Sequence, residues 1–173
     1  MEESSEETAT SVENVSFIQE KKIIATAGII LGADQATKQI VVKTIEHNSE
    51  GVVVVEGFLK FVNWENTGAA WSMFQDSSIP LAILSLVALI ALIRFRHQFE
   101  IETSMGKIAI GMLIGGILGN MIDRIAYQHV IDFIRFNINQ RGGGELGYPA
   151  FNIADVGICV GVGLLFVMTW RGQ

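Results

Sequence analysis

The sequence predicts an all-α membrane protein with four transmembrane helices and a small β element on one membrane face. Half of its 173 residues (50%) are hydrophobic and 17% are charged, against roughly a quarter charged in soluble domains. Three stretches, residues 77–93, 108–122 and 156–170, contain no charged residue. A fourth apolar run begins at Ile23. Together these features favour a bilayer over water as the surroundings of the chain.

The N-terminal residues 1–20 are expected to form a disordered acidic tail. They hold six glutamates and no basic residue, which accounts for the whole net charge of −6. Few large apolar residues are present to offset the entropy of ordering this segment. Residues 21–173 are then one neutral membrane domain without the basic field that recruits nucleic acid, so we expect no nucleic-acid partner.

The first span is expected at residues 23–45. Lys21 and Lys22 followed by an apolar run are typical of the start of a secretory signal. Because Asp34 and Lys38 continue the helical pattern beyond that run, a retained membrane helix fits better.

The other spans are expected at residues 77–95, 107–125 and 151–170. A helix rises 1.5 Å per residue, so a span needs about 20 residues and these helices must include polar flanks. Asp123 and Asp155 border the short apolar runs, which places both carboxylates near the membrane boundary.

Glycines recur at four-residue spacing in three of the spans, and such rows let helices approach closely in lipid. We therefore predict four tightly packed helices. The rows are Gly28 and Gly32; Gly111, Gly115 and Gly119; and Gly157 and Gly161.

The long connections that follow the first and third spans contain the β element. Val52–Val55 and the segment HVIDFIRFNI are strand candidates, and the glycine-rich NQRGGGELGYP indicates a flexible turn. Both connections should lie on one side of the membrane, with the termini and residues 94–107 on the other.

Ionisable residues at membrane depth are costly and indicate function by default. Asp34 and Lys38 are spaced i and i+4 in the favourable order for a structural ion pair. Asn120, Asp123 and Arg124 are predicted to form a polar corner at a helix end, where Arg124 would neutralise Asp123 by a forked hydrogen bond, in a site or in a simple salt bridge.

Two further acids, Asp132 and Asp155, are interpreted as uncompensated carboxylates. Asp132 lies among apolar neighbours, either on the wet face of a strand or in a dry pocket. Asn152 and Asp155 are spaced i and i+3 at the start of the fourth span, where Asn152 is a candidate helix cap.

Asp132 and Asp155 flank the connection between the last two spans and can converge at the membrane surface. Two close carboxylates share one proton, so the ionised acid can activate a water while the protonated acid donates to the carbonyl under attack. This scheme predicts peptide hydrolysis without a metal or cofactor. Cys159 is alone, and neither HExxH nor GxSxG occurs.

The ordered blocks ADQATK, ENTGAAWSMF, GGILGNMIDR, HVIDF and PAFNIAD resemble bacterial lipoprotein signal peptidase, also called signal peptidase II. The similarity runs from Asp34 to the end of the chain. It implies an aspartic endopeptidase that removes signal peptides from diacylglyceryl-modified prolipoproteins, cleaving before the lipid-modified cysteine. By this resemblance Asp132 and Asp155 are the catalytic dyad.

The resemblance also implies an inner-membrane protein with both termini in the cytoplasm, the β element in the periplasm and the active site toward the outer leaflet. Its partners would be lipidated prolipoproteins and membrane lipid, and we expect a monomer. The acidic tail has no counterpart in the family pattern, and the glycine-rich insert between Asp132 and Asn152 lengthens the link that joins the two acids. The positions that would bind substrate or shape the site are Asp34, Lys38, Asn66, Gly68, Asn120, Asp123, Arg124, Asn152 and Ala154.

Apolar side chains after the first span, Trp64, Trp71, Met73 and Phe74, are candidates for covering the site or for packing in the sheet. The alternative function is a small proton-coupled transporter that binds ions with its boundary carboxylates. Carriers place such groups near the bilayer midplane, whereas these acids lie at span ends.

Overall fold

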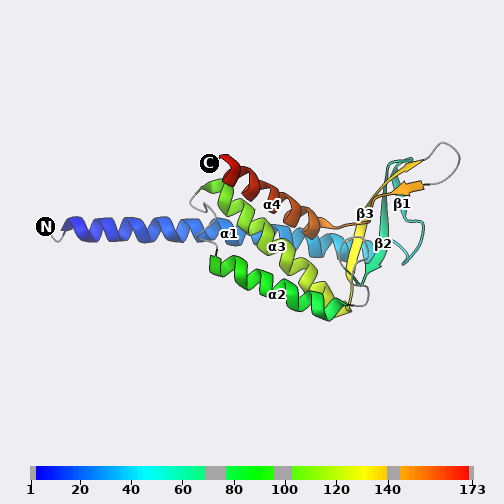
Figure 1. The fold of residues 1–173 in the computed structure, drawn as a ribbon, viewed down its shortest axis with the longest axis horizontal. Helices are drawn as coiled ribbons and strands as arrows, with labels where there is room; N and C mark the ends of the chain where they lie inside the picture. The colour runs from blue at the N-terminus through cyan, green and yellow to red at the C-terminus, as the bar shows by residue number, and fades with distance from the viewer. Residues whose placement is uncertain (1–2, 69–76, 96–102, 140–144, 172–173) are drawn as a thin grey trace.

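The computed structural model describes residues 3–68, 77–95, 103–139 and 145–171. Within these ranges four helices lie side by side, and a small sheet covers one end of the bundle (Figure 1). The sheet end is opposite the end at which α4 finishes. The helices are α1 (Glu3–Thr44), α2 (Ser78–Phe95), α3 (Ser104–Tyr127) and α4 (Ile153–Arg171).

Three of these helices, α2, α3 and α4, are long and apolar enough to cross a membrane. Their bounds agree with the predicted spans to within a few residues. Among the described residues α1 does not meet the same standard of hydropathy, because Asp34, Gln35 and Lys38 interrupt its apolar run.

At its N-terminus α1 differs from the sequence prediction. The backbone of residues 3–20, expected to be disordered, continues the helix. Helix nucleation is the costly step, and a segment joined to an already formed helix avoids it. Acidic residues near a helix N-terminus also suit the helix dipole. The division into a tail of residues 1–20 and a membrane domain of residues 21–173 stays a prediction.

Helix α3 packs against each of the other three helices, and its glycines permit close contact with α1 and α4. A Cβ atom added to Gly115 would lie 2.6 Å from the carbonyl oxygen of Ala27 on α1. One added to Gly161 of α4 would lie 2.9 Å from the carbonyl oxygen of Ala109. The glycine rows of the third and fourth spans therefore pack as predicted. The prediction for Gly28 and Gly32 is wrong, because no atom lies within 4 Å of either added Cβ.

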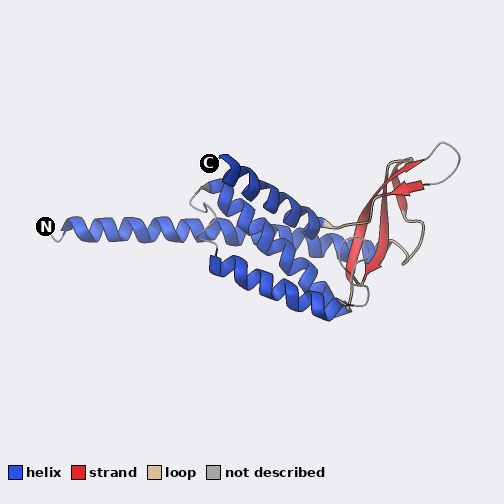
Figure 2. Ribbon diagram, in the orientation of Figure 1, coloured by secondary structure: helices blue, strands red, loops and turns tan. Residues whose placement is uncertain are grey.

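The sheet, red in Figure 2, is antiparallel, and its strands follow the order β1-β2-β3-β4. Its strands come from both long connections, as predicted: β1 (Val52–Val55), β2 (Leu59–Asn66), β3 (Val130–Asn139) and β4 (Glu145–Gly147). The glycine-rich segment was expected to be a flexible turn, but its residues 145–147 form β4 because they pair with β3. Residues 140–144 lie outside the described ranges.

Two sets of contacts fix the sheet on the helices. Val41 and Ile45 of α1 and Phe133 of β3 form a buried apolar cluster. Ile134 of β3 and Phe151 exchange backbone hydrogen bonds of 2.8 and 3.0 Å. Because Phe151 lies two residues before α4, this bridge holds β3 beside the N-terminus of α4.

Candidate active site

The site begins with a reciprocal cap at the start of α4. The Asn152 Oδ1 accepts a hydrogen bond of 3.0 Å from the backbone N–H of Asp155. In return the Asp155 Oδ2 accepts one of 3.2 Å from the backbone N–H of Asn152. This is the arrangement of a capping box, and it confirms the cap predicted at Asn152. It also fixes the Asp155 carboxylate at the N-terminus of α4.

The Asn152 side chain joins this cap to β3. Its Nδ2 donates to the Asp132 Oδ1 at 2.8 Å. The other carboxylate oxygen, Oδ2, accepts a hydrogen bond of 2.9 Å from Asn66 Nδ2 on β2. Asp132 is only 4% exposed, so of the two sequence-based alternatives the buried pocket is confirmed and the wet strand face is wrong.

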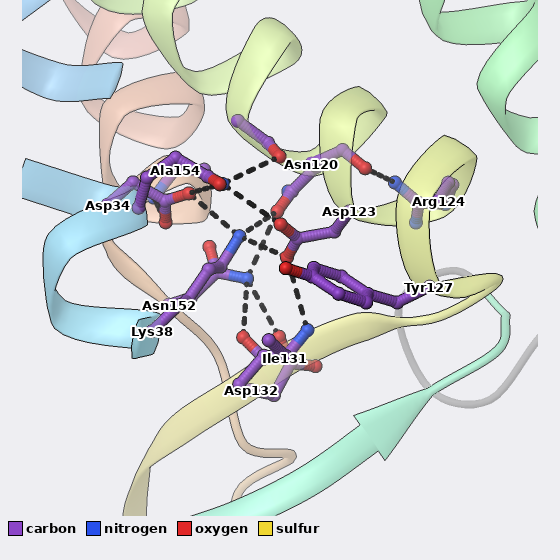
Figure 3. Close-up of polar contacts among 12 residues, drawn as sticks. Asp34, Lys38, Asn120, Asp123, Arg124, Tyr127, Ile131, Asp132, Asn152 and Ala154 are labelled. Carbon is purple, nitrogen blue, oxygen red and sulfur yellow. Dashed lines mark hydrogen bonds and ion pairs between the residues drawn. The ribbon is translucent and has the colours of Figure 1, made fainter. Parts of the chain in front are cut away.

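Asn120 of α3 supplies the remaining hydrogen bonds of this network (Figure 3). Its Nδ2 donates to the Asp155 Oδ1 at 2.7 Å, and its Oδ1 accepts from Asn152 Nδ2 at 3.1 Å. All four carboxylate oxygens of Asp132 and Asp155 therefore accept hydrogen bonds from neutral amide donors.

Both acids line one cavity of about 580 Å³ between the sheet and the ends of α3 and α4. Of the other residues predicted for the site, Asn66, Gly68, Asn120 and Arg124 also line it. Its walls include the apolar side chains of Trp64, Tyr148, Phe151, Val156, Cys159 and Val160. A cavity of this size with a few polar groups among apolar walls is typical of a ligand site.

Behind the cavity, Lys38 holds two carboxylates together (Figure 3). Its Nζ lies 2.8 Å from the Asp34 Oδ2, which confirms the predicted i, i+4 pair. It also lies 2.7 Å from the Asp123 Oδ2. All three side chains are no more than 1% exposed. None of them is among the cavity-lining residues of the described chain.

This buried ion triad also reaches the backbones that carry the two acids. The Asp34 Oδ1 accepts a hydrogen bond of 2.9 Å from the backbone N–H of Ala154 on α4. The Asp123 Oδ2 accepts a hydrogen bond of 3.3 Å from the backbone N–H of Ile131 on β3. The triad therefore links α1, α3, α4 and β3, and Asp34, Lys38, Asp123 and Ala154 shape the site without facing it.

The predicted forked pair between Arg124 and Asp123 is wrong. Arg124 donates instead to the backbone oxygens of Asn120 at 3.3 Å and Gly68 at 3.1 Å. Adjacent residues on a helix do not face each other. Asp123 therefore faces α1 and Lys38, whereas Arg124 faces the cavity.

The electrostatics of Asp132 fit a shared proton. Burial is the largest cause that raises the pKa of its carboxyl to about 7, and the nearby Asp155 carboxylate adds to the effect. Hydrogen bonds from Asn66 and Asn152 and the charge of Lys38 act in the opposite direction but do not cancel it. Near neutral pH a large share of Asp132 is therefore protonated.

Sequence reasoning missed Gln35, which donates to Asp123 Oδ1 at 2.9 Å and to Asp34 Oδ2 at 3.3 Å. Its polarity inside an apolar helix was the signal that could have found it. Tyr148 was also missed as a lining residue. Trp64 lines the cavity, whereas Trp71, Met73 and Phe74 lie outside the described residues.

Comparison with known proteins identifies the family. Residues 26–171 match the family described as "Signal peptidase (SPase) II". The lipoprotein signal peptidase of Syntrophotalea carbinolica is 33% identical over 152 residues, which cover 86% of this chain and 91% of that protein. The lipoprotein signal peptidase of Bacillus subtilis is 33% identical over 139 residues, covering 80% and 86% of the two chains.

A solved structure of similar fold supports the same assignment. It is described as a bacterial membrane enzyme at 2.3 Å resolution, and it superposes with a TM-score of 0.75 at 32% identity. The match covers 86% of this chain and 87% of that one. These similarities favour the peptidase over the transporter. The chain belongs to the signal peptidase II family: it is a multi-pass bacterial membrane protein and a lipoprotein signal peptidase, an aspartic protease that cleaves the signal peptides of prolipoproteins.

Proposed function

We propose that Asp132 and Asp155 are the catalytic dyad of this peptidase. The observation that carries the proposal is their joint position: both carboxylates line one cavity, and Asn152 is hydrogen bonded to each of them. Asp123, the other boundary carboxylate, is occupied by Lys38, Gln35 and the Ile131 backbone. It therefore serves as support.

The reaction needs one proton carried by the pair. Asp132, with its raised pKa, donates that proton to the carbonyl oxygen of the scissile peptide. The ionised Asp155 removes a proton from a water molecule that attacks the carbonyl carbon. The tetrahedral intermediate then collapses: Asp155 gives the proton that it took from water to the amide nitrogen, Asp132 takes back a proton from one hydroxyl of the intermediate, and the C–N bond breaks. This scheme requires no metal.

The substrate would enter from lipid. The apolar wall formed by Val156, Cys159 and Val160 runs along α4, a candidate span, toward the carboxylates. It can accept the signal segment and acyl chains, while the scissile bond, just before the lipid-modified cysteine, meets water at the dyad. We further propose that α1 is a fourth span, since its polar residues Asp34 and Lys38 are buried against α3 and α4.

The same proposal sets the orientation in the inner membrane. The termini would lie in the cytoplasm, and the sheet with the cavity would lie in the periplasm at the outer leaflet. One chain is expected to suffice, because both acids and their supporting amides, Asn66, Asn120 and Asn152, come from the same chain.

The test is cleavage of a lipidated precursor by the purified full-length protein in lipid nanodiscs. Asp132→Asn and Asp155→Asn should each abolish cleavage while thermal unfolding shows a folded protein. Glu50→Gln, an acid-to-amide change at an exposed residue, is the matched control and should retain full activity. Full activity in either aspartate variant would remove that acid from the dyad.

A further inference from the structure

The side chain of Arg135 stacks on Trp64, whose ring lines the catalytic cavity. The guanidinium carbon of Arg135 on β3 lies 4.3 Å from the ring centroid of Trp64, which lines the cavity. Among the residues that the structure describes, none forms a hydrogen bond or ion pair with this guanidinium, and its Nε is buried without a partner. The neighbouring acid Glu65 faces His47 and His129, at 3.6 Å each.

The glycine-rich insert holds the guanidinium in this position. A Cβ added to Gly147 of β4 would lie 2.7 Å from the Arg135 Nη2 and 3.0 Å from its Nε. The guanidinium is therefore sandwiched between the Trp64 ring and the backbone of β4.

The position of this cation relative to the dyad sets which part of a substrate could reach it. Trp64 is the register partner of Asp132, and Arg135 follows Asp132 by three residues on β3. A strand rises about 3.3 Å per residue, so the two β3 positions are about 10 Å apart. A substrate in extended conformation covers that distance with about three residues.

We propose that Arg135 forms a subsite for an acidic side chain two to four residues beyond the cleaved bond, on the mature side of the precursor. The inference rests on the proposed function, because it requires the scissile bond at Asp132 and the mature part leaving past the sheet. The occupant is a carboxylate of the substrate, since the guanidinium is stacked on a ring that itself lines the catalytic cavity. A planar guanidinium pairs with a carboxylate through two parallel hydrogen bonds.

The test measures kcat/KM for synthetic diacylglyceryl-cysteine peptides in nanodiscs of neutral lipid. Each peptide carries aspartate, asparagine or lysine at one of the second to fourth positions after the cleaved bond. Wild type should prefer aspartate over lysine at one of these positions by about fivefold, as expected for one half-exposed ion pair. Arg135→Gln should remove this preference, and Arg135→Glu should reverse it.

Two further variants separate charge from folding. Gly147→Ala keeps the charge but displaces the far end of a flexible side chain, so it should weaken the preference while leaving thermal unfolding nearly unchanged. Arg135→Lys should retain part of the preference. Lys43→Gln, which removes an exposed cation from the end of α1, is the control and should leave the preference intact.

Several outcomes would overturn the subsite. They are equal cleavage of all peptides by wild type, a preference that survives in Arg135→Gln, or a rate that follows added anionic lipid instead of peptide charge. Cleavage of the asparagine peptides by wild type distinguishes this failure from failure of the proposed function. If those neutral peptides are cleaved at the expected bond, the peptidase assignment stands whatever the charge preference shows.

Discussion

Replacement of Asp132 by asparagine is expected to stop cleavage and, in addition, to change how protein stability depends on pH. In the folded protein the pKa of Asp132 is raised from 3.8 to about 7, chiefly because the carboxyl is buried. Between these two values the folded state holds a proton that the unfolded state releases. Stability from this group is therefore greatest at low pH, falls as pH rises from about 4 to about 7, and then levels off.

The size of the effect follows from the two pKa values. Between pH 5 and pH 8, a carboxyl with these values lowers the free energy of unfolding by about 2–3 kcal/mol. The Asp132→Asn variant does not lose this stability as pH rises, because its amide does not titrate. At every pH it also lacks one favourable contact, because Asn66 and Asn152 both donate to the Asp132 oxygens and an amide NH₂ would face one of these donors. That cost of about 1–3 kcal/mol is independent of pH.

The assay is equilibrium or thermal unfolding of wild type and variant, in one detergent, at several pH values from 5 to 8. The difference in unfolding free energy between the two should shift by about 2–3 kcal/mol in favour of the variant as pH rises. Glu50→Gln, which changes an exposed acid, should show no such shift. A variant whose difference from wild type stays constant from pH 5 to pH 8 would refute the argument that Asp132 carries the shared proton.

Three other predictions concern the site and its support. The kcat/KM for a neutral lipopeptide should fall as pH rises through about 7, because the protonated form of Asp132 is lost there; a rate that keeps rising to pH 8.5 would contradict its role as the acid. Lys38→Met should cost about 3–5 kcal/mol in unfolding experiments, since it leaves the buried carboxylates of Asp34 and Asp123 unpaired; a variant as stable as wild type would show that the triad is dispensable. Gly116→Ala should lower the free energy of unfolding by about 1–3 kcal/mol, because the added Cβ would collide with the backbone oxygen of Ala154. Gly28→Ala should not lower it, because nothing lies within 4 Å of that Cβ. Equal effects of the two changes would argue against close packing of α3 on α4.

Local patterns were enough to predict three of the spans, two of the strands and the cap. Charge-free runs mark α2, α3 and α4, and the spacing of Asp34 and Lys38 predicts their ion pair. The helix start at Asn152 and the strand around Asp132 were also visible, because capping and strand formation depend on neighbours in the chain.

What failed depends on contacts between segments far apart in the sequence. Asp123 was assigned to Arg124, yet it pairs with Lys38, because the direction of each side chain from α3 is set by where α1 packs. Gln35 was overlooked for the same reason. The glycines at positions 28 and 32 resemble a packing row, but they lie on a face of α1 where nothing approaches within 4 Å. The strand β4 depends on pairing with β3, which its own glycine-rich sequence does not signal.

The chemistry of the donors explains how the site can keep a proton on Asp132. Asn66 and Asn152 orient its carboxylate through neutral amides, while the cation that supports the site, Lys38, is bound to Asp34 and Asp123. A lysine or arginine bonded directly to Asp132 would favour the ionised form strongly and lower its pKa. Neutral donors fix the geometry with a much smaller electrostatic effect. The charge of Lys38 instead neutralises the buried acids Asp34 and Asp123 and so links α1 to α3. The separation of positioning from charge compensation therefore allows a rigid site to retain the proton that its reaction requires.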